Sequence, residues 1–236
     1  MVRRLILVLG DQLSPPSRLS SLRDAVPDRD VVLMAEVAAE LAYAPHHRQK
    51  VAMVFSAMRQ HADALTGAGF RVRYVRHDDP ANSGSLPGEI LRAAGDLQPR
   101  EIVMARSGEW RLERAFDAME VAAPAPVIRR SDDRYLCDLE EFARWAEGRR
   151  ELRMEFFYRE MRRRYGLLME GREPAGGRWN FDAENRRRLP KGVRPPERLM
   201  IPPNPVTREA IAEIARLTPE GFGDLAAFGW ATNADE

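Results

Sequence analysis

The first 130 residues alternate between short apolar runs and longer segments with helical periodicity. The apolar runs are rich in Val, Ile and Leu and do not alternate with polar residues, which is typical of strands that are buried on both faces. Five runs predict strands, at Leu5–Leu9, Val31–Met34, Val72–Val75, Ile102–Ala105 and Val127–Ile128. The alternation of strands and helices favours an α/β fold with a five-stranded, parallel, doubly wound sheet of the Rossmann-like type.

Three segments between these runs carry apolar residues at helical spacing. Arg48–Leu65 places them on one stripe, and glycines follow it. Ser85–Leu97 begins with a serine that is a candidate N-cap. Glu109–Val121 brings Trp110 and Phe116 into a third predicted helix.

A different pattern begins after about residue 130. Leu139–Glu147 and Glu151–Met169 read as two helices, of which the second is amphipathic and basic. The stretch Gly171–Asn204 is rich in proline and glycine and has little periodicity, and a loop of this length is usually functional or a linker. A short helix is predicted at Thr207–Leu217, with Thr207 as its N-cap.

We divide the chain into an α/β domain at residues 1–131 and a helical, loop-rich segment at residues 132–236. A length of 236 residues allows one sizeable core with an appendage. The single cysteine excludes a disulfide scaffold, a Cys-x-x-Cys zinc site and a cysteine-held iron–sulfur cluster. No apolar run approaches the roughly 18 residues of a membrane span, and the first run is too short for a secretion signal. We therefore expect a cytoplasmic protein without membrane contact.

The formal net charge of +1 conceals an uneven distribution along the chain. Residues 149–198 contain 15 Lys and Arg against 8 Asp and Glu, which is a net charge of +7. The rest of the chain then carries about −6. Such a block is typical of a region with its own partner, although a solvated helix face gives the same pattern.

Polar residues follow the first two predicted strands, and in a doubly wound sheet ligands bind beyond such strand ends. The residues that would face one crevice there are Gly10, Asp11, Gln12, Glu36, Glu40 and Tyr43. The chain contains neither G-x-G-x-x-G nor a P-loop motif, which disfavours a dinucleotide. Because carboxylates repel phosphate, the set suits a neutral heterocycle that forms hydrogen bonds. In the alternative interpretation, Asp11 caps a turn and Glu40 is solvated.

The basic part of the chain holds a distinctive loop, Gly176–Arg188. Its two glycines permit unusual backbone angles, and Trp179 and Phe181 could anchor it. Three consecutive arginines, Arg186–Arg188, form an edge that suits phosphate. Aromatic and basic residues together on a loop indicate nucleic-acid binding, whereas an anchored surface loop with solvated arginines is the alternative.

Other chemistry has little support in the sequence. His46 and His47 would point in different directions on a helix, so no shared metal site is predicted. No hydrolase motif surrounds Ser56. We assign no catalytic residue and no metal ligand.

Several blocks that are spread in order over nearly the whole chain carry a family resemblance. They are Leu9–Ser14, Pro45–Lys50, Ser56–Arg59, Gly108–Arg111, Asp133–Cys137, Arg153–Arg163 and Gly177–Arg186. These blocks resemble the bacterial photolyase-related family, which comprises the iron–sulfur bacterial cryptochromes and (6-4) photolyases. The last two blocks are long enough to be specific.

The resemblance implies an N-terminal α/β antenna domain, an interdomain segment and a helical half that holds FAD and a four-cysteine 4Fe–4S cluster. It also implies a ribityl-lumazine antenna chromophore at the carboxyl edge of the sheet. On this sequence the acidic contact of that chromophore would fall on Glu40, near Gly10–Gln12 and Tyr43. Ala35 stands where relatives can carry Cys, so one antenna contact is expected to be absent here.

The resemblance further implies a partner for the basic loop. The segment 182–188 resembles the interdomain loop of the family, which faces DNA near an ultraviolet lesion. We carry Arg186 over as the contact to the lesion or to phosphate, with Arg187 and Arg188 beside it.

This chain differs from the family in one respect that decides its expected role. It ends about where the catalytic helical half of the family begins, and it has neither the cluster cysteines nor the FAD pocket. We expect the antenna and DNA-facing portion of a DNA-repair or blue-light photoreceptor protein, which is not itself competent for photorepair. The alternatives are a stand-alone α/β module that binds a small molecule and an interaction protein that recruits a partner through its basic loop.

The C-terminal aromatic residues bear on self-association. Phe222, Phe228 and Trp230 have no predicted surface to pack on. We expect all three to be exposed and to be covered by the missing half or by a second copy of the chain.

Overall fold

The structure is a computed structural model that describes residues 2–236, except for the side chain of Glu184. It divides into two compact units. The first unit, here called the α/β unit, contains Met1–Asp132 and Leu199–Glu236. The second, here called the helical unit, contains Asp133–Arg198. The contacts thus group residues 199–236 with the α/β unit, while the domain boundaries drawn from the sequence stay a prediction.

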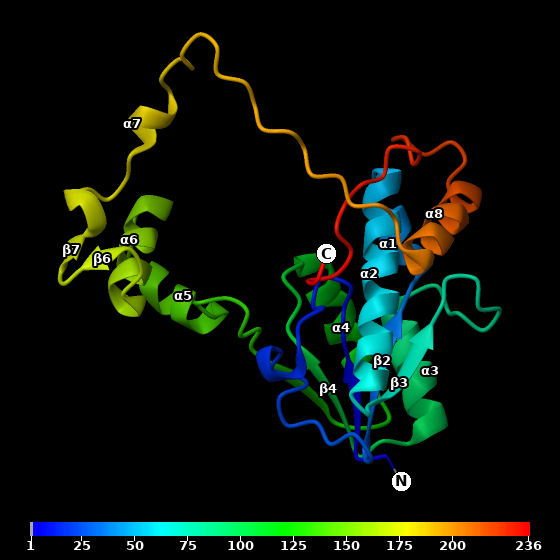
Figure 1. Cartoon of the computed structure of the whole chain (residues 1–236). Helices are drawn as coiled ribbons and strands as arrows, with labels where there is room; N and C mark the ends of the chain where they lie inside the picture. Colours follow the sequence, from blue (N-terminus) through cyan, green and yellow to red (C-terminus); the bar gives the residue numbers. More distant parts are fainter. Residues whose placement is uncertain (1) are drawn as a thin grey trace. The chain divides into compact units, whose positions relative to one another are not determined.

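A parallel five-stranded sheet forms the centre of the α/β unit (Figure 1). Its strands are β1 (Arg4–Leu7), β2 (Asp30–Ala35), β3 (Arg71–Val75), β4 (Glu101–Ala105) and β5 (Val127–Arg130). Their order is β3-β2-β1-β4-β5, with every neighbouring pair parallel. This arrangement confirms the predicted Rossmann-like α/β fold.

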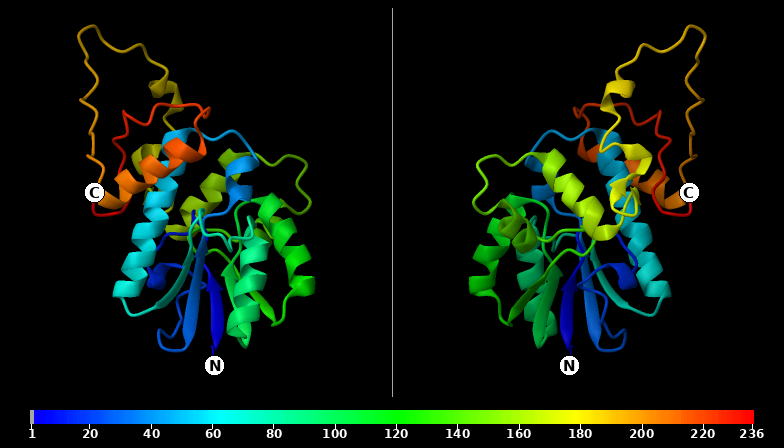
Figure 2. Two further views of the ribbon diagram at one scale, coloured as in Figure 1. Left: turned by 90° about the vertical axis from the view of Figure 1, so that its right-hand side faces the viewer. Right: turned by 90° about the vertical axis from the view of Figure 1, so that its left-hand side faces the viewer.

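Helices cover both faces of this sheet, because alternate strand residues point to opposite sides. Leu5 and Leu7 of β1 pack into one core cluster with α3 (Leu86–Leu97) and α4 (Trp110–Ala122). Ile6 of β1 packs into the other cluster, with α2 (Arg48–Gly67). Figure 2 shows the sheet between these helical layers.

One of the two predicted N-caps is confirmed. The side chain of Ser85 caps α3 by accepting a hydrogen bond from Gly88 N at 3.1 Å, as predicted. The final helix begins earlier than predicted, because α8 spans Pro205–Leu217 and its N-cap is Asn204 rather than Thr207. Asn204 Oδ1 accepts a hydrogen bond from Thr207 N at 2.9 Å.

The C-terminal segment of the chain packs onto α2. Phe55 of α2 joins Ile214 of α8, together with Leu225 and Phe228, in a third apolar cluster. The prediction that Phe228 is exposed is therefore wrong, since its side chain is 5% exposed. Phe222 and Trp230 are exposed at 55% and 47%.

Two short elements complete the α/β unit, and the two aromatic residues of α4 differ in exposure. The 3-10 helix η1 (Pro16–Arg18) follows β1, and α1 (Ala38–Ala42) follows β2. Trp110 starts α4 but is 78% exposed, whereas Phe116 one and a half turns later is fully buried. None of the helices among residues 2–236 is both long enough and apolar enough to cross a membrane.

The helical unit contains two helices and a short hairpin. Its elements are α5 (Leu139–Ala146), α6 (Met154–Tyr165), β6 (Met169–Glu170), β7 (Glu173–Pro174), η2 (Ala175–Gly177) and α7 (Asp182–Asn185). Phe142 and Trp145 of α5 pack against Phe157 of α6, with ring centroids 5.3 Å and 4.9 Å from the Phe157 ring. The helix α6 is shorter than predicted, because Gly166 adopts a left-handed φ of 65° and ends it.

Candidate functional site

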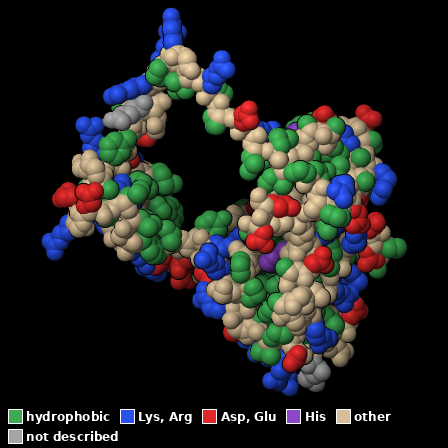
Figure 3. All heavy atoms as spheres, in the orientation of Figure 1, with side chains coloured by type: hydrophobic (Ala, Val, Ile, Leu, Met, Phe, Trp, Pro, Cys, Tyr) green, Lys and Arg blue, Asp and Glu red, His purple; other side chains and the backbone are tan. Residues whose placement is uncertain are grey.

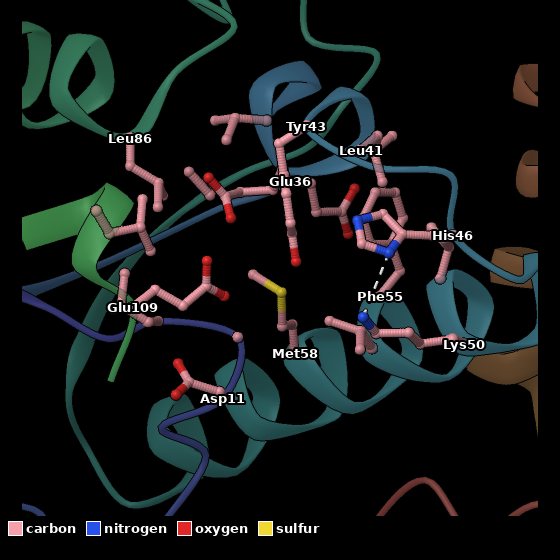
Figure 4. Close-up of a pocket in the computed structure, with 18 residues that line it drawn as sticks. Asp11, Glu36, Leu41, Tyr43, His46, Lys50, Phe55, Met58, Leu86 and Glu109 are labelled. Carbon is pink, nitrogen blue, oxygen red and sulfur yellow. Dashed lines mark hydrogen bonds between the residues drawn. The ribbon is translucent and has the colours of Figure 1, made fainter. Parts of the chain in front are cut away.

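A cavity of about 190 Å³ lies at the carboxyl ends of β1, β2 and β4 (Figure 4). It is lined by six of the seven residues that the sequence and the resemblance indicated: Gly10, Asp11, Ala35, Glu36, Glu40 and Tyr43. The structure therefore brings these residues together around one hollow. We call this cavity the edge pocket.

One predicted residue, Gln12, does not line the edge pocket. Its side chain is fully buried. The amide nitrogen donates to Arg106 O at 3.2 Å and to Ala105 O at 3.4 Å, while its oxygen accepts from Leu9 N at 3.4 Å. Gln12 thus ties the loop after β1 to the end of β4.

The floor of the edge pocket is formed where Gly10 approaches α2. A Cβ atom at Gly10 would lie 3.0 Å from Met58 Sδ and 3.3 Å from Val54 Cγ1. Both of these side chains line the pocket. Since such contacts are closer than most real Cβ contacts, a larger residue at position 10 requires Met58 and Val54 to shift by a few tenths of an ångström.

Glu36 lies at the end of β2 with its carboxylate fully engaged. It accepts two hydrogen bonds from Arg59, at 2.7 Å and 3.0 Å, one from Tyr74 Oη at 2.6 Å, and one from His77 N at 3.0 Å. Arg59 also donates to Glu213 of α8 at 2.5 Å. Glu36 is 1% exposed, so it forms part of the pocket wall and has little acceptor capacity left for a ligand.

Two side chains of this buried group, Arg59 and Tyr74, have pKa values above their ordinary range. Burial opposes the charge on Arg59, but hydrogen bonds from it to Glu36 and Glu213 outweigh burial and raise the pKa of Arg59. Burial, assisted by the charge of Glu36, raises the pKa of Tyr74, so this phenol remains a hydrogen-bond donor.

The opposite side of the pocket is held by Arg111, which the sequence did not single out individually. Its guanidinium donates to both oxygens of Glu40, at 2.9 Å and 2.7 Å, and to Glu109 at 3.0 Å. The guanidinium carbon also lies 4.1 Å from the ring centroid of Tyr43. The hydrogen bond to Glu40 raises the pKa of Arg111. Arg111 therefore fixes both Glu40 and Tyr43 at the pocket.

Acidic groups outnumber basic ones among the lining residues. Asp11, Glu36, Glu40 and Glu109 are set against His46 and Lys50, and Lys50 Nζ lies 3.3 Å from His46 Nδ1. In Figure 4 the carboxylates of Asp11 and Glu109 and the thioether of Met58 point into the hollow. The pocket thus combines acceptor oxygens with an apolar wall.

The sequence reasoning missed the contribution of the loop after β4. Glu109 and Leu112 line the pocket because β1 is the strand at which the sheet order reverses, with β2 on one side and β4 on the other. Ligands bind at such a reversal of strand order. The sequence contained a signal for this contribution, because Gly108–Arg111 comes shortly after the fourth predicted strand and so lies at its carboxyl end.

The predicted DNA-binding residues belong to the helical unit. Arg186, Arg187 and Arg188 follow α7 and are exposed. Figure 3 shows Lys and Arg side chains along this extended segment. The Phe181 ring lies against Gly176, with Cζ 3.0 Å from the position of a Cβ there, but its side chain is 44% exposed.

No metal site is found among the described side chains, in which no group of three or more His, Cys, Asp or Glu is placed to hold an ion.

Comparisons with known proteins identify the family of this chain. Residues 6–230 match the sequence profile of the family described as deoxyribodipyrimidine photo-lyase-related protein, and the chain belongs to that family. A more particular relative is a protein named (6-4) photolyase from Agrobacterium fabrum, which is 46% identical over 228 residues. The alignment covers 97% of this chain and 45% of the relative, in its N-terminal portion. The chain thus spans less than half the length of the relative that it matches.

Proposed function

We propose that this chain is the antenna and DNA-facing portion of a photolyase-related protein, and that the edge pocket binds a chromophore of the ribityl-lumazine class. The observation that carries this proposal is the acid-rich pocket at the carboxyl ends of β1, β2 and β4, at the point where strand order reverses. Family membership supports the same role.

The chemistry of the pocket fits a neutral heterocycle with a polyol chain. Carboxylates such as Asp11 and Glu109 can accept hydrogen bonds from ring N–H groups and hydroxyls. Val54, Met58 and Leu112 supply an apolar wall for a flat ring. A bound chromophore would supply absorption of near-ultraviolet and blue light, and the protein would hold and orient it.

The described residues do not fit the iron–sulfur cluster that the family uses. The chain contains one cysteine, which cannot hold a four-cysteine cluster. We therefore derive no photorepair step from this chain and propose that it does not repair DNA by itself.

The test of the pocket is a titration of the purified chain with a ribityl-lumazine, followed by fluorescence anisotropy. Gly10→Ala should weaken binding, because the added methyl requires Met58 and Val54, which line the pocket, to shift. Gly95→Ala is the matched control, since a Cβ at that position in α3 meets nothing within 4 Å. Absence of saturable binding by the unaltered chain would refute the antenna role.

The DNA-facing role rests on the exposed arginines of the helical unit. Binding to a duplex that carries an ultraviolet lesion should weaken steeply with salt, and Arg186→Ala should weaken it further, because each phosphate contact releases counterions. Lumazine binding without any DNA binding would instead favour the stand-alone small-molecule module. DNA affinity that is unchanged in Arg186→Ala would contradict the assignment of Arg186.

A further inference from the structure

A tryptophan in the helical unit is surrounded by guanidinium groups. The guanidinium carbon of Arg163 lies 4.5 Å from the ring centroid of Trp179, and those of Arg162 and Arg159 lie at 5.3 Å and 5.4 Å. All three arginines belong to α6, whereas Trp179 follows the β6–β7 hairpin. We call these four residues the tryptophan platform.

Arg162 is the fixed part of the tryptophan platform. It is 5% exposed and donates to the carbonyl oxygens of Leu167, Leu168 and Trp179, the last at 2.9 Å. A buried guanidinium held by three carbonyls clamps the hairpin to α6. The position of the Trp179 ring is therefore set by the fold of the helical unit and not by a mobile loop.

Arg159 and Arg163 differ in how their charges are balanced. Arg159 donates two hydrogen bonds to Glu155 Oε1, at 2.9 Å and 2.7 Å. Arg163 is exposed and has no carboxylate partner among the described side chains. Its guanidinium lies over the Trp179 ring, and its side chain is exposed within a region of net charge +7.

We propose that Arg163, held by Trp179, is a second DNA contact that binds a backbone phosphate. A planar guanidinium with five donors matches phosphate oxygens in pairs, and stacking on a ring reduces the side-chain entropy that binding must overcome. Three guanidinium groups compete with a base for the face of Trp179, so the contact is to phosphate and not a base stack. This proposal rests on the proposed DNA-facing role. It adds a DNA contact on α6 to the proposed contacts of Arg186–Arg188.

The proposal is tested by binding of the whole chain to a labelled DNA duplex over a series of salt concentrations. Arg163→Ala should weaken binding several-fold and lower the slope of log affinity against log salt by about 0.9, the contribution of one phosphate contact. Arg163→Lys should recover part of the affinity, because it retains charge but not the planar stack. Trp179→Ala should weaken binding without a change in formal charge.

A neighbouring arginine supplies the matched control. Arg164 is also exposed, but it forms an ion pair with Glu141 and lies 5.4 Å from the ring of Tyr165. Arg164→Ala should leave the salt slope unchanged. Far-ultraviolet circular dichroism checks that α6 remains folded in each variant.

The outcomes separate this proposal from the proposed function. A salt slope that is unchanged in Arg163→Ala, or lowered equally in Arg164→Ala, overturns the second contact. If Arg186→Ala weakens binding while Arg163→Ala does not, the DNA-facing role stands and only the second contact fails. If the unaltered chain does not bind DNA, both proposals fail.

Discussion

Buried polar side chains in this protein are mostly matched one by one with partners. Glu36 is the fullest case, since four hydrogen bonds reach its two oxygens from Arg59, Tyr74 and the backbone of His77. His61 on α2 is an exception, because its Nε2 atom is buried without a hydrogen-bond partner among the described groups. A buried charge with hydrogen-bond partners is stabilised, whereas a buried imidazole without a partner is costly to protonate. We therefore expect the neutral form of His61 to be favoured in the folded chain.

His61 should make the stability of the chain depend on pH. Burial lowers the pKa of His61 below its ordinary 6.5. The unfolded chain therefore takes up a proton near pH 6.5 that the folded chain does not bind, and the free energy of unfolding falls as pH drops below that value. The slope from this one site is at most about 1.4 kcal/mol per pH unit.

The measurement is urea denaturation of the chain between pH 5 and 7. His61→Gln should flatten the dependence, since an amide does not titrate in this range. His46→Gln, at the half-exposed rim of the edge pocket, is the control and should retain it. A slope that persists in His61→Gln would show that another group titrates.

Arg111 should affect ligand binding indirectly, by holding Glu40 and Tyr43 in position at the edge pocket. Arg111→Ala releases Glu40 and Tyr43 from their positions at the edge pocket. We expect lumazine affinity to fall about tenfold, which is about 1.4 kcal/mol. Arg114→Ala is the control on the same helix, because Arg114 reaches Asp117 and Trp110 instead. Equal affinities for Arg111→Ala and the unaltered chain would exclude this positioning role.

At the scale of elements, the strands follow the sequence more closely than the helices do. Each of the five apolar runs lies in a strand or overlaps one. The inner strands β1, β2 and β4 are buried on both faces, as an unbroken apolar run predicts, whereas the edge strands β3 and β5 are partly exposed. Helix limits are less regular. With Gly166 as its C-cap, α6 ends at Tyr165, four residues before the predicted end, and Asn204 moves the start of α8. The limits of these helices are decided by single capping residues.

The helix α4 offers a direct test of which aromatic residue belongs to the core. Phe116 is fully buried between α4 and the sheet, whereas Trp110 is 78% exposed. Phe116→Ala should reduce the free energy of unfolding by about 3–5 kcal/mol through loss of burial and creation of a cavity. Trp110→Ala should change it by less than about 0.5 kcal/mol. Chemical denaturation measures both, and a comparable loss in the two variants would contradict the assignment of faces.

At the scale of the whole molecule, the α/β unit is assembled from two separate parts of the chain. Residues 199–236 return to α2 after the helical unit, and α8 contributes Glu213 to the buried charges around Arg59. Ile214 and Phe228 close the apolar cluster on α2. The edge pocket therefore depends on a segment that is remote in sequence, since Arg59 also holds the Glu36 wall of the pocket.

Ending the chain at Arg198 should destabilise the α/β unit. The apolar face of α2 at Val51 and Phe55 would be exposed, and Arg59 would lose Glu213, a change that costs about 3–5 kcal/mol for a buried pair. We expect a lower melting temperature and stronger binding of a hydrophobic dye. Ile214→Ala in the full chain should reproduce part of the loss. An unchanged melting temperature in the shortened chain would contradict this packing.

The sequence by itself determined the strands, the fold class and six of the residues that line the edge pocket. These follow from local properties, because apolar runs specify buried strands and the carboxyl ends of parallel strands must meet at one edge. Only the tertiary structure decided that Glu36 is saturated by Arg59, that Arg111 holds Glu40, and that Phe228 is buried. Each of these depends on contacts between residues far apart in the chain, and the pattern of neighbouring residues carries no record of which distant partner a side chain will meet.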